Sequence, residues 1–573
     1  MREQLVGVGK KSKINSKSRE LGNSFASRFG PDAVRGRRPK LPPSLFKRPT
    51  MAAAIWARNL SGGCRQRHLP GAVDMAGPKE RDVWQYGDFQ TPPELAQEVC
   101  RLLALRGIAP GAIVEPTCGR GAFLAAAAAS FPDVRPLLGV EINERYVAEA
   151  RELLGGSADV EQGDFFAIDW NAVLARSPGP WLVLGNPPWV TSAELGLLKS
   201  TNLPTKSNFQ AHQGLDAITG KANFDISEWM LLNQLEWLKE RSGWLAVLVK
   251  TSVARKVLRQ AWRKQDPVGG AAIYRLDAMK HFGAAVDACL FILPVELGDQ
   301  SQDCDVFDDL ADTSPATTIG FHDETLVSNV PAYLRRRNLI GANRDYVWRS
   351  GVKHDCSKVM ELSAAADGGL VNGLGERAEL EAAIVYPLLK SSDVAKGRTR
   401  ADRFMIVTQR EIGEDTSGIA AQAPRTWQYL LDHAEQLDAR GSVIYRGKPR
   451  FSVFGVGAYT YAPWKVAISG FYKALNFMKV GPADGKPVMM DDTIYFLPCQ
   501  SEEEADFIMT LVQSEPYMEL VGAMIFLDEK RPITADLLKR ISLEQVAREL
   551  GLSDQYAAFT GRSVPPQLQL ALG

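Results

Sequence analysis

Apolar runs alternate with helical stretches over residues 112–295, which is the pattern of buried strands joined by crossover helices. Helices are predicted over residues 122–130, 145–154 and 227–238. The runs predicted to be strands are 112–114, 137–140, 181–184, 244–249, 271–276 and 288–295. The sequence therefore predicts an α/β domain built on a mostly parallel sheet.

The alternation stops near Leu297, and the polar residues that follow, 298–303, predict a linker. Beyond it the chain has aromatic, strand-like pieces and becomes more helical from Glu502. Ahead of the α/β domain, residues 1–81 are rich in Ser, Gly and Pro and lack sustained periodicity, which predicts a disordered tail. We therefore divide the chain into residues 1–81, 82–297 and 298–573.

The formal net charge of zero is the sum of unlike parts. Residues 1–80 contain 17 Lys and Arg against five acids, which leaves 50 basic and 62 acidic residues in 81–573. Three interpretations of the basic tail stay open: a nucleic-acid-binding arm, an acid-poor targeting peptide, or sequence upstream of a true start at Met51 or Met75. A neutral total therefore does not exclude a nucleic-acid partner.

The cysteines and the longest apolar run argue against disulfide-rich, zinc-binding and membrane-spanning proteins. Seven cysteines are scattered without a C-x-x-C pair, which argues against a disulfide scaffold and a cysteine zinc site. The longest apolar run, residues 122–131 with one Ser, is about half as long as the roughly 20 residues that span a bilayer. We expect a soluble, cytoplasmic monomer that uses no metal and binds no membrane.

Four polar residues end or follow strand positions at spacings of 26, 23 and 22 residues: Glu115, Glu141, Asp164 and Asn186. Ligands of open parallel sheets bind beyond the carboxyl ends of the strands, so these side chains are predicted to line one crevice. The first is followed by a loop with Gly119 and Gly121, which suits close approach of a nucleotide at a helix N-terminus. Read singly, a short glycine loop before a helix is most often a simple turn, and Glu141 could equally be a surface acid. The phenylalanines that follow Asp164, read singly, are more often core residues.

The segment from Gly185 to Trp189, Gly-Asn-Pro-Pro-Trp, carries the strongest signal. It follows a fully apolar strand, and two prolines cannot continue a sheet ladder, so the chain must leave the sheet there. Asn186 and the neighbouring carbonyls offer acceptors for an exocyclic amino group, and Trp189 offers a face for a planar ring. The alternative is a proline-rich turn with a packed tryptophan.

These motifs resemble those of the gamma-class, TaqI-type N6-adenine DNA methyltransferases of restriction–modification systems. The [ND]-P-P-[YFW] motif of that family is matched by Asn186, Pro187, Pro188 and Trp189, and its acidic glycine loop by residues 115–123. Residues 86–96 look like the family's upstream methionine-binding segment, and residues beyond 300 fall where its recognition domain would lie. The resemblance implies a class I S-adenosylmethionine-dependent methyltransferase fold in 82–297, followed by an α+β target-recognition region in 298–573.

By resemblance, the methyl donor is S-adenosylmethionine and the catalytic residues are Asn186, Pro187, Pro188 and Trp189. The implied product is N6-methyladenine, formed on a base flipped out of double-stranded DNA at a specific sequence in a prokaryotic cytosol or nucleoid. A separate cognate restriction endonuclease, or none, is expected rather than a fused nuclease. The implied donor-binding residues are Gln90, Thr91, Pro92, Glu115, Thr117, Gly119, Gly121, Glu141, Asp164 and Phe165.

Residues 441–480 contain six basic and nine aromatic residues and no acid, a composition that favours contact with phosphates and bases. The alternative is a strand-rich core whose polar face is basic. The residues predicted to contact DNA are Lys206, Lys221, Arg446, Lys448, Arg450 and Lys465. Three other functions stay open at this stage: methylation of protein or RNA amino groups, methylation of cytosine N4, and a non-catalytic DNA-binding subunit.

Overall fold

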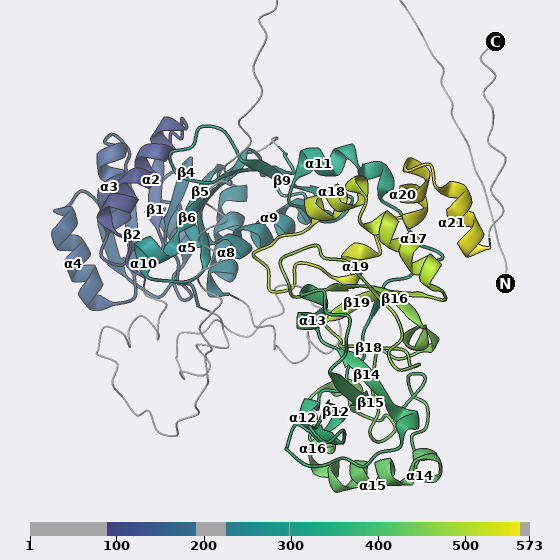
Figure 1. The fold of residues 1–573 in the computed structure, drawn as a ribbon. Helices are drawn as coiled ribbons and strands as arrows, with labels where there is room; N and C mark the ends of the chain where they lie inside the picture. Colours follow the sequence, from purple (N-terminus) through teal and green to yellow (C-terminus); the bar gives the residue numbers. More distant parts are fainter. Residues whose placement is uncertain (1–88, 191–224, 297, 299, 562–573) are drawn as a thin grey trace, which may run out of the picture. The chain divides into compact units, whose positions relative to one another are not determined.

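A ten-stranded sheet organises the first half of the protein in the computed structural model, which describes residues 89–190, 225–296, 298 and 300–561 (Figure 1). All of these residues belong to one unit, residues 76–573. The strand order is β10-β9-β8-β6-β7-β5-β4-β1-β2-β3. The strands are β1 Ala112–Glu115, β2 Leu137–Glu141, β3 Asp159–Gln162, β4 Trp181–Gly185, β5 Gly243–Lys250, β6 Ala271–Asp277, β7 Asp287–Val295, β8 Asp303–Phe307, β9 Thr317–His322 and β10 Thr325–Val327.

The sheet has the topology of a class I S-adenosylmethionine-dependent methyltransferase, as the sequence predicted. Strands β3, β2, β1, β4 and β5 run parallel, and β7 lies antiparallel between β5 and β6. All six predicted strands form. The apolar-run criterion did not find β3, because this edge strand has the sequence Asp-Val-Glu-Gln and buries only Val160.

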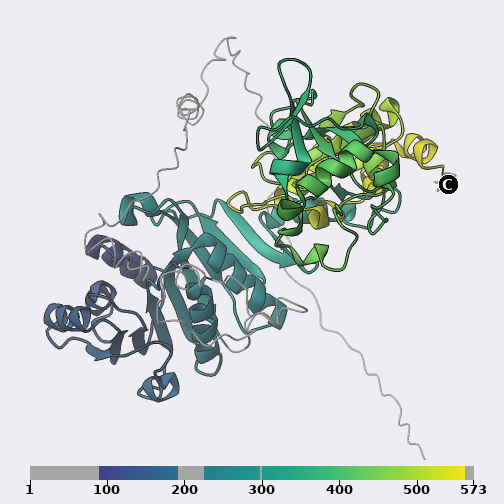
Figure 2. The same cartoon turned by 90° about the horizontal axis from the view of Figure 1, so that it is seen from below.

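Helices cover both faces of the sheet (Figures 1 and 2). Apolar side chains of α2 and α3 pack on one face, and those of α8 and α9 pack on the other. The three predicted helices form within one residue of their expected ends, as α3, α4 and α8. The helices of this part are α2 Pro93–Leu105, α3 Ala122–Ser130, α4 Glu144–Leu154, α5 Trp170–Leu174, α8 Ile226–Lys239, α9 Thr251–Lys264 and α10 Ala278–Phe282.

The sheet does not end at the predicted linker. Strands β8, β9 and β10 follow residue 297 and extend the sheet from β6, so the division at 297 is not a boundary of the sheet. The functional division of the chain into three parts stays a prediction. In the described part of the chain, we find no helix with the length and hydrophobicity needed to cross a membrane.

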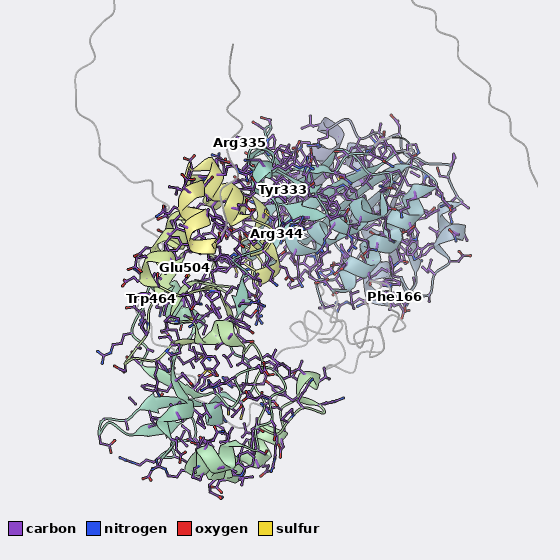
Figure 3. The ribbon with its side chains drawn as sticks, turned by 90° about the vertical axis from the view of Figure 1, so that its right-hand side faces the viewer. Phe166, Tyr333, Arg335, Arg344, Trp464 and Glu504 are labelled. Carbon is purple, nitrogen blue, oxygen red and sulfur yellow. The ribbon has the colours of Figure 1, made fainter. Side chains whose placement is uncertain are left out.

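The remaining residues form two smaller sheets and a helical end. A five-stranded sheet has the order β13-β12-β15-β14-β18, and a four-stranded sheet has the order β11-β19-β16-β17. Helices are abundant from Glu502, as predicted; Trp464 opens β16 and Glu504 lies in the first turn of α17 (Figure 3). The strands are β11 Arg349–Ser350, β12 Glu361–Ala364, β13 Leu370–Asn372, β14 Val385–Leu389, β15 Arg403–Ile406, β16 Trp464–Ser469, β17 Met478–Val480, β18 Met489–Met490 and β19 Ile494–Cys499. The helices are α11 Val330–Arg335, α12 Ser357–Met360, α13 Ser391–Ala395, α14 Ile419–Gln422, α15 Pro424–Asp432, α16 Ala434–Asp438, α17 Glu502–Val512, α18 Glu515–Met524, α19 Ala535–Leu538, α20 Leu543–Glu549 and α21 Ser553–Thr560.

Candidate active site

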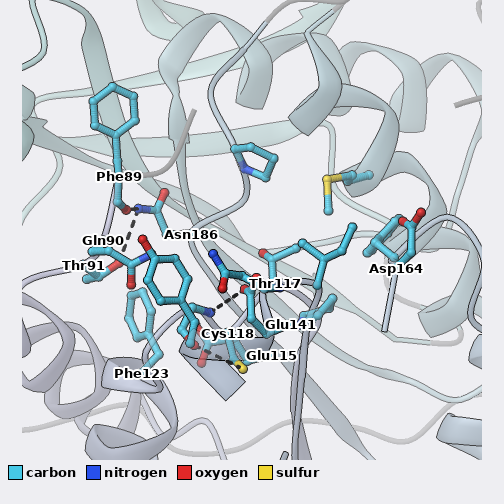
Figure 4. A pocket seen from close by; sticks show the side chains of 18 of the residues that line it. Phe89, Gln90, Thr91, Glu115, Thr117, Cys118, Phe123, Glu141, Asp164 and Asn186 are labelled. Atoms are coloured by element: carbon cyan, nitrogen blue, oxygen red, sulfur yellow. Dashed lines mark hydrogen bonds between the residues drawn. The ribbon is translucent and has the colours of Figure 1, made fainter. Parts of the chain in front are cut away.

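A cavity of about 280 Å³ lies at the carboxyl ends of β1, β2 and β4 (Figure 4). The structure brings the four strand-end residues together, because parallel strands end at a common edge of the sheet. Most of the predicted donor-binding residues line this cavity, together with Asn186 and Pro188. The lining donor-binding residues are Gln90, Thr91, Glu115, Thr117, Gly119, Glu141, Asp164 and Phe165.

The glycine loop after β1 lies against the upstream segment. Gly119 has φ +50°, and a Cβ built there would lie 2.6 Å from Gln90 Oε1, so a side chain at this position would force the end of the Gln90 side chain to move. The Arg120 amide donates to the same oxygen over 3.1 Å. Gly121, with φ +82°, caps the start of α3, and Pro92 stands immediately before α2; neither lines the cavity. The upstream segment is thus joined to the glycine loop by direct contact.

Two carboxylates of unlike environment face the cavity. Glu141 accepts hydrogen bonds from the backbone amides of Gly119 (2.9 Å) and Asn143 (2.8 Å). Glu115 is 3% exposed, and its Oε2 accepts no hydrogen bond from any described residue. Burial, with the neighbouring Glu141 charge, raises the pKa of Glu115 well above its ordinary value. The same burial raises the pKa of the Cys118 thiol, which leaves it protonated and poorly nucleophilic.

The third strand end adds a carboxylate beside an aromatic cluster. Asp164 Oδ1 accepts the Phe166 amide over 2.9 Å, which fixes the turn after β3. The ring of Phe165 packs against Phe166 and Trp170, at centroid distances of 5.5 and 5.3 Å. Phe166, labelled in Figure 3, also lines the cavity, although the sequence did not single out its role. The ring centroids of Phe166 and Trp229 of α8 lie 5.2 Å apart. The sequence alone does not predict this contact, because the two residues are far apart in the chain.

Asn186 is held in one orientation at the end of β4. Its Nδ2 donates to the Phe89 carbonyl oxygen (2.8 Å) and to Thr91 Oγ1 (3.3 Å). The amide group is thereby turned so that Oδ1 is the remaining acceptor, and this buried oxygen has no hydrogen-bond partner among the described residues. A buried acceptor without a donor is costly, so it marks a position where a ligand donor would be favoured.

Trp189 does not line this cavity, and its predicted stacking on a target base stays a prediction. Its side chain is 4% exposed and lies 5.5 Å from Phe89 and 5.0 Å from Phe282, measured between ring centroids. Its indole Nε1 donates to the Leu248 carbonyl oxygen over 3.2 Å. Apolar packing and this hydrogen bond hold the ring in the core cluster, as the alternative of a packed tryptophan describes. Pro187 is also absent from the cavity wall.

Lys250, which the sequence analysis did not predict, connects the two chain segments that flank residues 191–224 in the sequence. Lys250 Nζ, at the end of β5, donates to the Trp189 carbonyl oxygen (2.9 Å) and to Asp225 Oδ2 (2.8 Å). Asp225 caps α8 by accepting from the Ser227 amide over 3.1 Å. The feature of the sequence that could have indicated this role is the position of Lys250, a cation directly after the apolar run 244–249.

The basic block over residues 441–480 is partly neutralised by acids that lie outside it. Arg450 pairs with Asp438 at 2.7 Å, whereas Arg446 and Lys448 are exposed. Lys465 is wrong as a predicted DNA contact, because its side chain is 1% exposed and its Nζ donates to the Ala462 carbonyl oxygen over 2.6 Å. Burial lowers the pKa of Lys465 to about 7. Lys206 and Lys221 lie outside the described residues.

The chain was compared with known proteins. No protein-family model matches it. The type II methyltransferase M.NspV of Nostoc sp. is 44% identical over 474 residues, which cover 82% of this chain and 98% of that protein. The chain belongs to the type II methyltransferases. It is therefore a DNA methyltransferase of the restriction–modification kind, and S-adenosylmethionine is its methyl donor.

Two solved structures of restriction–modification proteins show weak similarity to the chain. The type IIL enzyme MmeI in complex with DNA matches with a TM-score of 0.45 and 11% identity, over 82% of this chain and 73% of that chain. The M protein of the type I enzyme EcoKI matches with a TM-score of 0.27 and 15% identity, over 39% and 48% of the two chains.

Proposed function

We propose that this type II methyltransferase transfers a methyl group from S-adenosylmethionine to the N6 amino group of an adenine flipped out of duplex DNA. The observation that carries the proposal is Asn186, whose Oδ1 is buried and without a described partner while its Nδ2 is held by Phe89 and Thr91. An exocyclic amino group is the donor that such an acceptor requires. The modified sequence would be the target of a cognate restriction endonuclease.

The residues around the cavity fit the donor's chemistry. S-adenosylmethionine has a positive sulfonium and an ammonium, and the cavity offers the carboxylates of Glu115 and Glu141. The buried, unpartnered Glu115 Oε2 supports a polar contact there. Glu141 would hold the ribose hydroxyls. We assign the adenine of the donor to Asp164 and Phe165, and its methionine part to Gln90, Thr91 and residues 117–121. When bound, the donor supplies an electrophilic methyl group.

Asn186 would prepare the target nitrogen for attack. The lone pair of an adenine amino nitrogen is delocalised into the ring, which makes it a poor nucleophile. Hydrogen bonds from the amino group to Asn186 Oδ1 and the Pro187 carbonyl favour a more tetrahedral nitrogen, whose lone pair can then point at the methyl group. Fixed placement of these acceptors can supply most of the acceleration, because the site needs little reorganisation during transfer.

Trp189 and its aromatic neighbours would form the wall of the base slot. Extruding a base costs a few kcal/mol, and an aromatic contact offsets about 1–3 kcal/mol of that cost. Because Phe89 and Phe282 cover Trp189 here, the base would meet this aromatic group from the Asn186 side or displace one covering ring.

The proposal is tested by incubating the protein with methyl-labelled donor and amplified, unmethylated genomic DNA, followed by digestion to nucleosides. We expect label in N6-methyl-2′-deoxyadenosine. Label in N4-methyl-2′-deoxycytidine would contradict the adenine assignment, and label confined to protein or RNA would contradict DNA as the substrate.

The variant Asn186→Ala tests the role proposed for Asn186. It should abolish labelling and leave calorimetric binding of S-adenosylhomocysteine nearly intact, because Asn186 is assigned to the base rather than to the donor. A variant that loses both properties would show that Asn186 serves the donor pocket. Asn223→Ala, in the same region of the sequence but outside the predicted motif, is the control for substitution of an asparagine.

A further inference from the structure

The loop that joins β14 to β15 is unusually long for two paired strands and is strongly basic. The strands pair antiparallel, with Leu388 opposite Arg403, yet residues 390–402 separate them. Most hairpin loops contain about 2–5 residues, and long loops in compact domains usually serve a function. After the short helix α13, the basic loop, defined as residues 396–403, contains four cations: Lys396, Arg398, Arg400 and Arg403.

About half of this charge is not neutralised by the protein. Arg400 has a 93% exposed side chain, and the acid nearest to it among its ion pairs in the described residues, Asp402, lies 3.9 Å away and is itself 79% exposed. Arg398 and Arg403 share the single carboxylate of Asp393, at 3.6 and 3.2 Å. Lys396 is exposed and has no ion pair within the described ranges. Four cations against two carboxylates leave a net charge of +2 on the surface.

Another arginine cluster shows the opposite arrangement. Arg335, Arg336 and Arg337 follow one another in the chain, but all are engaged by acids (Figure 3 labels Arg335). Arg335 and Arg336 bind Glu519 at 2.7 and 2.5 Å, and Arg337 binds Asp323 at 2.5 Å. These ion pairs connect parts of the protein to one another. In the basic loop, by contrast, Lys396 is exposed without an ion pair among the described residues, and Arg398 and Arg400 have acids only at 3.6 and 3.9 Å, which leaves these three cations accessible to an external anion.

The base of the loop is fixed to the protein core. Lys390 Nζ lies between Glu361 (2.7 Å) and Asp491 (2.5 Å), and its backbone amide donates to Asp393 Oδ2 over 3.0 Å. Val394 is fully buried in an apolar cluster that also contains residues of the four-stranded sheet. The cations therefore project from a preformed support, which reduces the entropy lost when they bind a partner.

We propose that the basic loop, residues 396–403, is a contact surface for the phosphates of the DNA that is methylated. This inference rests on the proposed function. Residues 81–573 are acidic in total, with 50 basic and 62 acidic residues, so any attraction of this part of the chain for DNA must come from local concentrations of cations. Long, exposed Arg and Lys side chains suit the regularly spaced phosphates of a duplex, which position the protein without reading sequence.

The variant that tests the loop is Arg398→Gln/Arg400→Gln. Binding of a fluorescein-labelled duplex is measured by anisotropy over a series of salt concentrations. Loss of two phosphate contacts should lower the slope of log K against log salt by about 2 and weaken binding of every sequence to a similar extent. A slope equal to that of the wild type would overturn the proposal, and so would a loss confined to one sequence, because phosphate contacts do not discriminate.

Two further double variants make the result specific. Arg101→Gln/Arg263→Gln removes the same charge from exposed positions in the second halves of α2 and α9, and should leave the slope unchanged. Arg446→Gln/Lys448→Gln tests the rival basic block. If the salt slope falls in the Arg446/Lys448 variant and not in the loop variant, the phosphate contact lies in the basic block rather than in the basic loop. An equal fall in the Arg101/Arg263 control would show that total charge alone is responsible.

Failure of the loop proposal can be told apart from failure of the proposed function. If the wild-type protein labels adenine in DNA and the loop variant binds and methylates like it, only the loop proposal is wrong. If the wild-type protein neither binds DNA nor labels it, the proposed function itself fails. Circular dichroism and donor-analogue binding show that the variant is folded, which we expect because Arg400 makes no contact with the core.

Discussion

Replacing Lys250 by Met should loosen the segment that contains the catalytic motif. The ammonium of Lys250 donates to the Trp189 carbonyl oxygen and to Asp225, and Met preserves the length and apolar stem while removing both hydrogen bonds. The side chains of Lys250 and Asp225 are 21% and 7% exposed, so the pair lies between a surface ion pair, worth about 0.2–1 kcal/mol, and a buried pair, whose disruption costs about 3–5 kcal/mol. We expect a loss of about 2 kcal/mol in the free energy of unfolding.

The catalytic effect should exceed what stability alone explains. Once the Trp189 carbonyl is released, residues 186–190 can shift by a fraction of an ångström, and misplacement on this scale lowers kcat by about 10- to 100-fold. KM for the donor should change little, because Lys250 does not line the cavity. The assays are methyl transfer to DNA under saturating donor and urea unfolding followed by fluorescence. Lys250→Arg, which keeps a cation, should recover part of kcat.

Lys256→Met is the matched control. Lys256 of α9 binds Glu228 of α8 at 2.8 Å, so its ion pair joins two helices and does not involve residues 186–190. Its loss should lower stability slightly and leave kcat unchanged. The reasoning would be refuted if Lys250→Met retained wild-type kcat, if both variants lost kcat equally, or if a double-mutant cycle with Asp225→Asn gave no coupling energy.

Three further outcomes follow from the burial of particular side chains. Trp189→Ala should cost about 3–5 kcal/mol of unfolding free energy and Trp189→Phe about 1 kcal/mol, measured by urea titration, because only the first removes the packing of the ring; equal costs would mean that the ring is not held in the core. Lys465→Met should raise stability and leave DNA affinity unchanged, with the largest gain below pH 7. The pKa of Lys465 in the folded protein is lowered to about 7, from an ordinary value of about 10.4. Wild-type stability therefore rises as the pH increases from about 7 to about 10.4, because the penalty for burying the charge disappears. A gain in stability that is independent of pH would contradict the buried charge. Glu115→Gln should leave the Tm near that of the wild type, since burial raises the pKa of Glu115 and favours its neutral form in the unliganded protein. The variant should nevertheless lower calorimetric affinity for S-adenosylhomocysteine by about 10- to 100-fold, because the ammonium of the ligand favours the ionised form of Glu115 and Gln cannot ionise; unchanged affinity would remove Glu115 from the donor site.

The sequence predicted the strand ends well because their placement follows from a topological rule. Glu115, Glu141, Asp164 and Asn186 are separated by one strand and one helix each, and a parallel sheet must bring such positions to one edge. No knowledge of side-chain packing is needed for that inference. The polar edge strand β3 escaped the apolar-run criterion, although the acid that follows it, Asp164, was found from its spacing.

The surroundings of single side chains were much harder to predict. Trp189 was expected to face a ligand, but Leu248 and Phe282, which are distant in sequence, cover it. The basic block was recognised by its lack of acids within a window of sequence, and the acids that neutralise it lie outside that window; Lys479, for example, binds Glu502 and Asp506. Conversely, the acids between residues 390 and 402 masked the basic loop in a composition count.

The continuation of the large sheet past residue 297 limits how such enzymes can be recombined. Strand β8 pairs with β6 in register from Ala271 and Cys304, and it covers an edge whose residues 271–274 are all buried. A hybrid joined at 297, with its first half from this protein and its second from a relative, would have to pair β6 of one parent with β8 of the other. A mismatch there would bare an apolar strand edge, the kind of surface that seeds association between chains. Exchange of target specificity by grafting should therefore use junctions after β10, so that both parents keep their own sheet whole.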